Sequence, residues 1–114
     1  MALPFSPSVS RNGFVFISGQ IHLNEEGKLL EGTIEDQTHQ IMKNLQKLLE
    51  KENVSFNDVV KTTIYTTDMS LYSQVNEVYI SYFPANLPAR EMVSVKELPL
   101  GARLEISMIV ARSN

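Results

Sequence analysis

The sequence contains no cysteine, and only two of its 114 residues are histidine. The first absence excludes disulfide bonds, thiolate nucleophiles and cysteine metal sites, and it fits a cytoplasmic location. His22 and His39 are isolated, and two separate histidines without cysteine make a poor case for a metal centre. We expect His39 on a helix surface and His22 in a turn after a strand, both in structural roles.

Long apolar runs and dense positive charge are also missing. No run approaches the roughly 20 apolar residues of a membrane helix, and the start, Met-Ala-Leu-Pro, lacks the pattern of a secretory signal. Net charge is −3, and the ten lysines and arginines are scattered along the chain. Nucleic-acid affinity rests on clustered positive charge, so this distribution argues against such a partner. A phosphate-binding glycine loop, a GxSxG elbow and an HExxH motif are absent too.

The residues that are present predict a single α+β domain over 1–114. Apolar positions spaced by three and four predict two helices, one from the N-cap Thr33 to Asn53 and one from the N-cap Ser70 to Pro84. β-branched and aromatic residues, with some alternation, predict strands at 13–21, 58–68, 90–96 and 103–111, the first of which can form a hairpin with 2–9. This order suits a mixed sheet with both helices packed on one face.

Two helices cover only one face of such a sheet. The other face would carry Phe14, Phe16 and Ile109 or their neighbours. A small domain with a bare, half-apolar sheet tends to associate. The sequence therefore predicts an oligomer, without setting the number of subunits.

Arg90 and Glu105 are the main candidates for chemistry. In "NLPAREMVSV" (86–95), a strand that should be buried starts with an arginine, whose charge cannot be removed. If the two terminal strands form a hairpin, the side chains of Arg90 and Glu105 approach each other. They would then form an ordinary ion pair, or an anion site in which the guanidinium binds a carboxylate and Glu105 orients a water or accepts a proton. Asn76, on the second helix, is either a solvated position or a third site residue.

Five segments carry a wider pattern, in this order: "VFISGQI" (15–21), "VVKTTIYTTDM" (59–69), "VNEVYISYF" (75–83), "PAREMVSV" (88–95) and "LPLGARLEISMIVA" (98–111). Together they resemble the YjgF/RidA family over residues 13 to 112. The resemblance implies a chorismate-mutase-like fold and a homotrimer with sites in clefts between subunits. It also implies hydrolysis of reactive enamines and imines, such as 2-aminoacrylate and 2-iminobutanoate, to 2-keto acids and ammonia without a cofactor or metal.

The resemblance also assigns roles to individual residues. Arg90, in "PAR", matches the arginine that binds the substrate carboxylate. Glu105, in "LEI", matches the glutamate that positions the attacking water. Ser18, in "SGQ", and Asn76, in "VNEVY", match residues that line the cleft. Backbone groups around Arg90 and Met92 match those that polarise the imine and the water.

Three positions depart from the family pattern. Phe5, in "LPFSPSV", stands where many active members have the tyrosine of "GPYSQA", which removes a hydroxyl that could bond to the water or the product. Met92 replaces a cysteine that several members have. Glu91 follows the arginine where a small hydroxyl residue is commoner, and on a strand it should point away from Arg90.

Two other functions stay open. One is a non-catalytic binder of small carboxylates that regulates amino-acid metabolism, which the loss of a hydroxyl at Phe5 favours. The other is an endoribonuclease or translation inhibitor, a label that some relatives carry. The acidic balance and the lack of a basic cluster argue against the second alternative.

Overall fold

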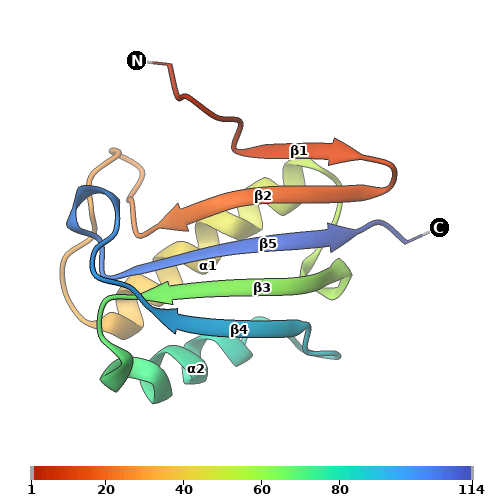
Figure 1. Cartoon of the computed structure of the whole chain (residues 1–114). Helices are drawn as coiled ribbons and strands as arrows, with labels where there is room; N and C mark the ends of the chain where they lie inside the picture. The colour runs from red at the N-terminus through yellow and green to blue at the C-terminus, as the bar shows by residue number, and fades with distance from the viewer. Residues whose placement is uncertain (1, 114) are drawn as a thin grey trace.

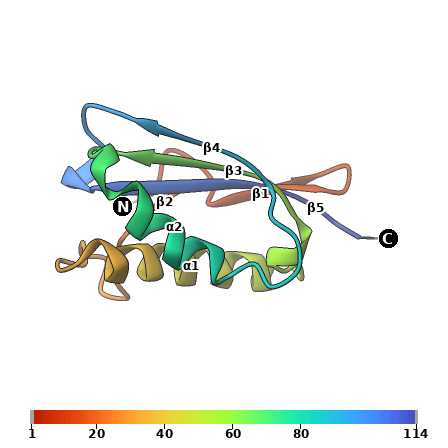
Figure 2. The same cartoon turned by 90° about the horizontal axis from the view of Figure 1, so that it is seen from below.

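The structure is a computed structural model that describes residues 2–113. Five strands form one sheet, in the order β1-β2-β5-β3-β4 (Figure 1). The strands are β1 (Ser8–Arg11), β2 (Phe14–Ile21), β3 (Val59–Thr66), β4 (Ala89–Ser94) and β5 (Leu104–Ala111). Only β3 and β4 are parallel, and both helices lie on one face (Figure 2). The predicted mixed sheet with two helices on one face is confirmed.

Helix α1 (Ile34–Lys51) begins and ends where the sequence predicts. The Thr33 hydroxyl accepts a hydrogen bond from the backbone N–H of Asp36 at 3.1 Å, which satisfies one of the free donors of the first turn. After the helix, Asn53 adopts a φ of 58°, a left-handed conformation that asparagine tolerates better than most residues. Local side-chain chemistry therefore sets both ends.

Helix α2 (Tyr72–Ile80) is shorter than predicted at both ends. Ser70 lies in a 3₁₀ turn (Met69–Leu71) that Asp68 caps, with the Asp68 carboxylate accepting hydrogen bonds from both the N–H and the hydroxyl of Ser70. The α-helix stops before Pro84, which has no N–H to donate to the carbonyl of Ile80 four residues earlier. Among residues 2–113, neither helix is long and apolar enough to cross a membrane.

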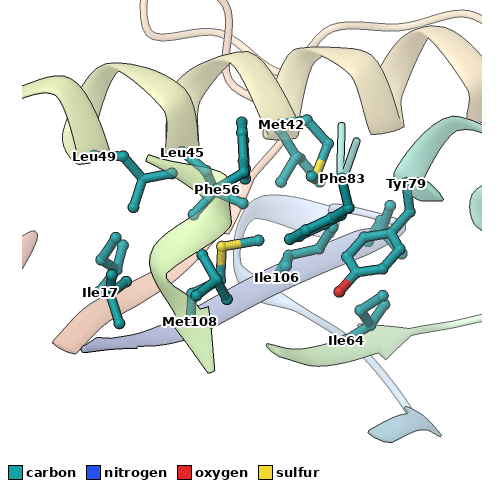
Figure 3. Close-up of a cluster of buried hydrophobic side chains, with 14 of the residues drawn as sticks. Ile17, Met42, Leu45, Leu49, Phe56, Ile64, Tyr79, Phe83, Ile106 and Met108 are labelled. Carbon is teal, nitrogen blue, oxygen red and sulfur yellow. The ribbon is translucent and has the colours of Figure 1, made fainter. Parts of the chain in front are cut away.

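The hydrophobic core lies between the helices and one face of the sheet (Figure 3). In β5 the side chains alternate as predicted, with every second one buried: Leu104, Ile106, Met108 and Val110. Each fully buried aliphatic side chain contributes roughly 1.5–3 kcal/mol. The opposite face is bare, and Val9, Phe14 and Phe16 are 43–45% exposed there, so the predicted apolar outer face is confirmed.

The last two strands do not form the hairpin that would bring Arg90 and Glu105 together. β4 pairs only with β3, in parallel, and β5 lies on the other side of β3. The cause is the crossover: parallel neighbours need a long connection, and the segment containing α2 supplies one between β3 and β4. A hairpin does exist at the other end of the chain, where β1 pairs with β2 through a turn at Asn12 and Gly13.

Candidate functional site

Arg90 lies on the helix side of the sheet, at the edge strand β4. It pairs with Thr62, which is fully buried beneath α2. Its guanidinium carbon lies 5.6 Å from the ring centre of Tyr72 and 5.1 Å from that of Tyr79, and Nη2 donates to the Tyr72 hydroxyl at 3.4 Å. Aromatic faces attract a cation but leave its hydrogen-bond donors free. Within residues 2–113 no carboxylate pairs with Arg90, so the guanidinium is available to an anion.

Asn76 occupies the same face of α2. It stands four residues after Tyr72 and three before Tyr79, spacings that place side chains together on a helix. Its Oδ1 atom is buried and has no hydrogen-bond partner in the part of the chain that the structure describes. An unsatisfied buried acceptor costs about 1–3 kcal/mol. A donor from a bound ligand or from a second protomer would satisfy it.

The neighbours of Arg90 along β4 point in the expected directions. Glu91 faces the outer side of the sheet, where it forms an ion pair with Lys61 at 3.3 Å, so its charge is directed away from the guanidinium. Met92 pairs with Ile64, and its side chain packs against the hydrophobic core. Position 92 therefore offers a potential ligand its backbone rather than its side chain.

Glu105 lies on the outer face, in β5, between Ile21 of β2 and Tyr65 of β3. It is half-buried, and burial raises the pKa of its carboxyl above the usual value. Gly19 makes room for it: a Cβ at that position would collide with the Glu105 carboxylate. The glycine inside "SGQ" was thus a usable signal, since an isolated strand glycine often marks a close approach.

Ser18 and Phe5 lie beside Glu105, around a hollow of about 730 Å³ that we call the β2-edge hollow. It opens where β1 stops pairing with β2, at Ile17. Ser18 holds the N-terminal segment across this edge: its hydroxyl donates to the carbonyl of Ser6 at 2.7 Å, and its N–H donates to that of Pro7 at 2.9 Å. The hollow is lined by Leu3, Phe5, Pro7, Ser18, Gly19, Gln20, Ile21, Leu23, Asn44, Lys47, Leu48, Pro99, Leu100 and Glu105.

The six predicted site residues thus form two separate groups. Arg90, Asn76 and Met92 lie on the helix side near β4, while Glu105, Ser18 and Phe5 surround the hollow near β2. Arg90 and Glu105 do not approach each other within one chain, because β3 separates their strands and the side chains leave opposite faces. A site that uses both residues therefore needs a second copy of the chain.

The histidines have the structural roles that the sequence predicts. His22 is 1% exposed; its Nδ1 bonds to the carbonyl of Leu30 at 3.1 Å, and its Nε2 accepts from the backbone N–H of Arg103 at 3.0 Å. This pattern fixes a neutral ring that ties the loop after β2 to the start of β5. His39 is exposed and bonds to the hydroxyl of Tyr82. Among residues 2–113 no three potential metal ligands lie together.

Replacing His22 by glutamine is expected to destabilise the fold by about 1–3 kcal/mol at pH 7.5, because a buried bonding network is broken. The loss should shrink toward pH 5. Burial lowers the pKa of His22 below its ordinary 6.5, so its contribution is present above pH 6.5 and is lost as pH falls through the folded-state pKa. Thermal unfolding of both proteins across this range measures the effect. A difference in Tm that stays constant with pH would contradict it.

Comparison with known proteins decides the family. The sequence pattern described as Endoribonuclease L-PSP matches residues 1–112. This chain belongs to the YjgF/RidA family. A RutC family protein of Aquifex aeolicus is 46% identical over 112 residues, covering 96% of this chain and 89% of that protein. The mouse protein named 2-iminobutanoate/2-iminopropanoate deaminase is 39% identical over 110 residues, covering 96% and 82%.

Solved structures of the family have the same fold. YyfA of Yersinia pestis, described as a Rid family protein of unknown function, superimposes with a TM-score of 0.94 at 40% identity, covering 97% of this chain and 90% of that one. The fold that the family pattern implied is therefore confirmed. Some members of the family bear the name of reactive intermediate or imine deaminases, and others bear only the family name.

Proposed function

We propose that this protein hydrolyses reactive 2-imino acids and their enamine tautomers, including 2-aminoacrylate and 2-iminobutanoate, to 2-keto acids and ammonia. The support is twofold. Relatives about 40% identical carry the name of such deaminases. An arginine that pairs with no carboxylate among residues 2–113 and a half-buried glutamate stand at the positions that the family pattern assigns to substrate binding and water activation.

The main support for this function is that each of the two groups of site residues is incomplete within one chain. On the helix side, the guanidinium of Arg90 pairs with no carboxylate and the buried Oδ1 of Asn76 has no hydrogen-bond partner within residues 2–113. Glu105 borders an open hollow on the outer side. In a homotrimer, the Arg90 group of one protomer and the Glu105 group of the next would together form a complete site. The bare apolar face with Val9, Phe14 and Phe16 supplies a surface for that association.

The reaction follows from these groups. Arg90 binds the substrate carboxylate through two parallel hydrogen bonds. Glu105 of the neighbouring protomer holds a water against C2 and takes a proton from it as the C–O bond forms. The electron pair of the C=N bond moves to nitrogen, which receives that proton from Glu105. The resulting carbinolamine then loses ammonia: Glu105 takes the hydroxyl proton as the C=O bond forms, and a proton passes from Glu105 to the amino nitrogen as the C–N bond breaks.

The environment of Glu105 suits this exchange of protons. A raised pKa brings a carboxyl closer to the operating pH, where an acid–base group works best. Imines are already electrophilic, so most of the catalysis comes from positioning the carboxylate and the water. A half-buried glutamate in β5, fixed between two strands, is a suitable element for such positioning.

A second candidate function is a sensor that binds small carboxylates without turnover. The observation in its favour is Phe5, which reaches the hollow beside Glu105 without a hydroxyl. RNA cleavage has less support, because both ring nitrogens of His22 are bonded within the fold and His39 bonds to the hydroxyl of Tyr82.

The test is to generate 2-iminobutanoate in situ with a threonine dehydratase and to follow its decay with and without the protein. We expect faster formation of 2-ketobutanoate and ammonia when the protein is present. Binding of 2-ketobutanoate without acceleration would favour the sensor instead. Cleavage of RNA that survives loss of Arg90 would favour the ribonuclease.

A further inference from the structure

Within one protomer, the β2-edge hollow is larger and more apolar than a small imino acid requires. Its volume is about 730 Å³, within the roughly 300–1,000 Å³ of pockets that enclose drug-sized ligands. Most of its side-chain walls are hydrocarbon, from the N-terminal segment, β2, α1 and the loop before β5: Leu3, Phe5, Ile21, Leu23, Leu48 and Leu100. Glu105 and Ser18 line the same hollow, so it is continuous with the group that would activate water.

Leu100 is the wall residue that most needs an explanation. It has φ 60° and ψ 12°, a left-handed conformation that a side chain with a Cβ disfavours, and it is 73% exposed. Folding alone would favour glycine there, as at the next position, Gly101, with φ 79°. An exposed leucine in a strained backbone beside Glu105 therefore contributes little to the fold of one chain, and it is well placed to contact something in the hollow.

We propose that the β2-edge hollow binds the side chain that the substrate carries at C2, and that it makes the protein selective for 2-imino acids with large aliphatic or aromatic substituents. This inference rests on the proposed function. With the carboxylate held by Arg90 of one protomer and C2 beside Glu105 of the next, the remaining substituent points into the hollow that Glu105 borders. Phe5 supplies a ring there without a polar group, which suits a hydrocarbon substituent.

The first experiment compares substrates. An L-amino-acid oxidase with catalase makes the imines of alanine, leucine and phenylalanine in situ, and semicarbazide traps the imine that survives. A single methylene in an apolar pocket changes kcat/KM by about 10- to 200-fold. We expect the leucine-derived and phenylalanine-derived imines to be hydrolysed with at least about tenfold higher kcat/KM than 2-iminopropanoate. Equal values for all three would overturn the inference and leave the proposed function standing.

The second experiment removes the Leu100 side chain from the hollow without destabilising the fold. Leu100→Gly relieves backbone strain, so its Tm should equal or exceed that of the parent. The ratio of kcat/KM for the leucine-derived imine to kcat/KM for 2-iminopropanoate should fall toward one. The matched control is Asn53→Gly, which changes another left-handed residue, at the end of α1 and outside the hollow. It should leave the preference unchanged. A preference that survives Leu100→Gly would overturn the inference.

Binding measurements test the subsite independently of the reaction. Calorimetric titration with 4-methyl-2-oxopentanoate and with pyruvate should give the tighter Kd for the longer acid, and Leu100→Gly should remove the difference. If the protein hydrolyses no imine but shows this binding pattern, the subsite stands and only the proposed reaction fails. If both keto acids bind equally well, the subsite is wrong whatever the activity.

Discussion

Replacing Glu105 by glutamine is expected to lower kcat for imine hydrolysis by about 100-fold or more while raising Tm at neutral pH. The loss of rate follows from removing the group that takes the proton from water, since such catalysis contributes roughly 10²- to 10⁴-fold. The gain in stability follows from the surroundings of the carboxyl. Burial disfavours its charged form and raises its pKa above the ordinary 4.5, and an amide has no charge to bury.

The pH dependence of this difference has a definite sign. The folded carboxyl binds its proton more tightly than the unfolded one, so its contribution to stability is fully present below about pH 4.5 and is lost as pH rises through the folded-state pKa. The Tm of Glu105→Gln should therefore exceed that of the parent near pH 7 and approach it in acid. Calorimetric scans at several pH values, together with imine decay at pH 7.5, measure both effects.

Glu50→Gln is the matched control, because Glu50 is exposed on α1 and outside the hollow. It should leave the rate of imine hydrolysis unchanged. Retention of more than about a tenth of the parental kcat in Glu105→Gln would remove Glu105 from the mechanism. A lower Tm at neutral pH would show that the carboxylate makes a favourable contact in the fold.

The sequence predicted the elements better than their arrangement, for a physical reason. The ends of α1 depend on Thr33 and Asn53, whose side chains or backbones act within a few residues, and the alternation of β5 reflects burial on one face. The partner of β4 depends instead on where the α2 crossover returns the chain. Nothing within 90–111 specifies that, so the sequence could not decide whether the last two strands pair with each other.

The same distinction applies to the site. Arg90 and Glu105 were found through the family pattern, but their position on opposite faces could not be read from their spacing. The ring contacts of Tyr72 and Tyr79 with Arg90 were missed, because two tyrosines at helical spacing look like ordinary core and surface residues. The closeness of Gly19 to Glu105 could have been suspected, since an isolated glycine interrupts a β-rich segment.

Replacing Arg90 by alanine is expected to raise KM for every 2-imino acid, with a loss of transition-state binding of about 2–5 kcal/mol, because the substrate carboxylate would lose its charged partner. Arg90→Lys should recover only part of this, since an ammonium does not form the two parallel bonds of a guanidinium. The fold should be little affected: in residues 2–113 the guanidinium contacts two aromatic rings and one hydroxyl but no carboxylate. Steady-state kinetics and Tm of both variants test these statements, and an unchanged KM in Arg90→Ala would contradict them.

Co-assembly of the two impaired variants, Arg90→Ala and Glu105→Gln, gives the sharpest test of a site shared between protomers. If each site takes Arg90 from one protomer and Glu105 from the next, random co-assembly of Arg90→Ala with Glu105→Gln places both native residues together in about a quarter of the sites. Purification of co-expressed, separately tagged variants through both tags removes the homo-oligomers, and in a mixed trimer about one site in three then holds both native residues. Such trimers should recover roughly a third of the parental rate, measured at an imine concentration well below the KM of Arg90→Ala, where each variant alone shows little activity. A site within one chain would contain one substitution in every subunit and recover nothing. Because β3 separates the two residues in one chain, we expect the recovery.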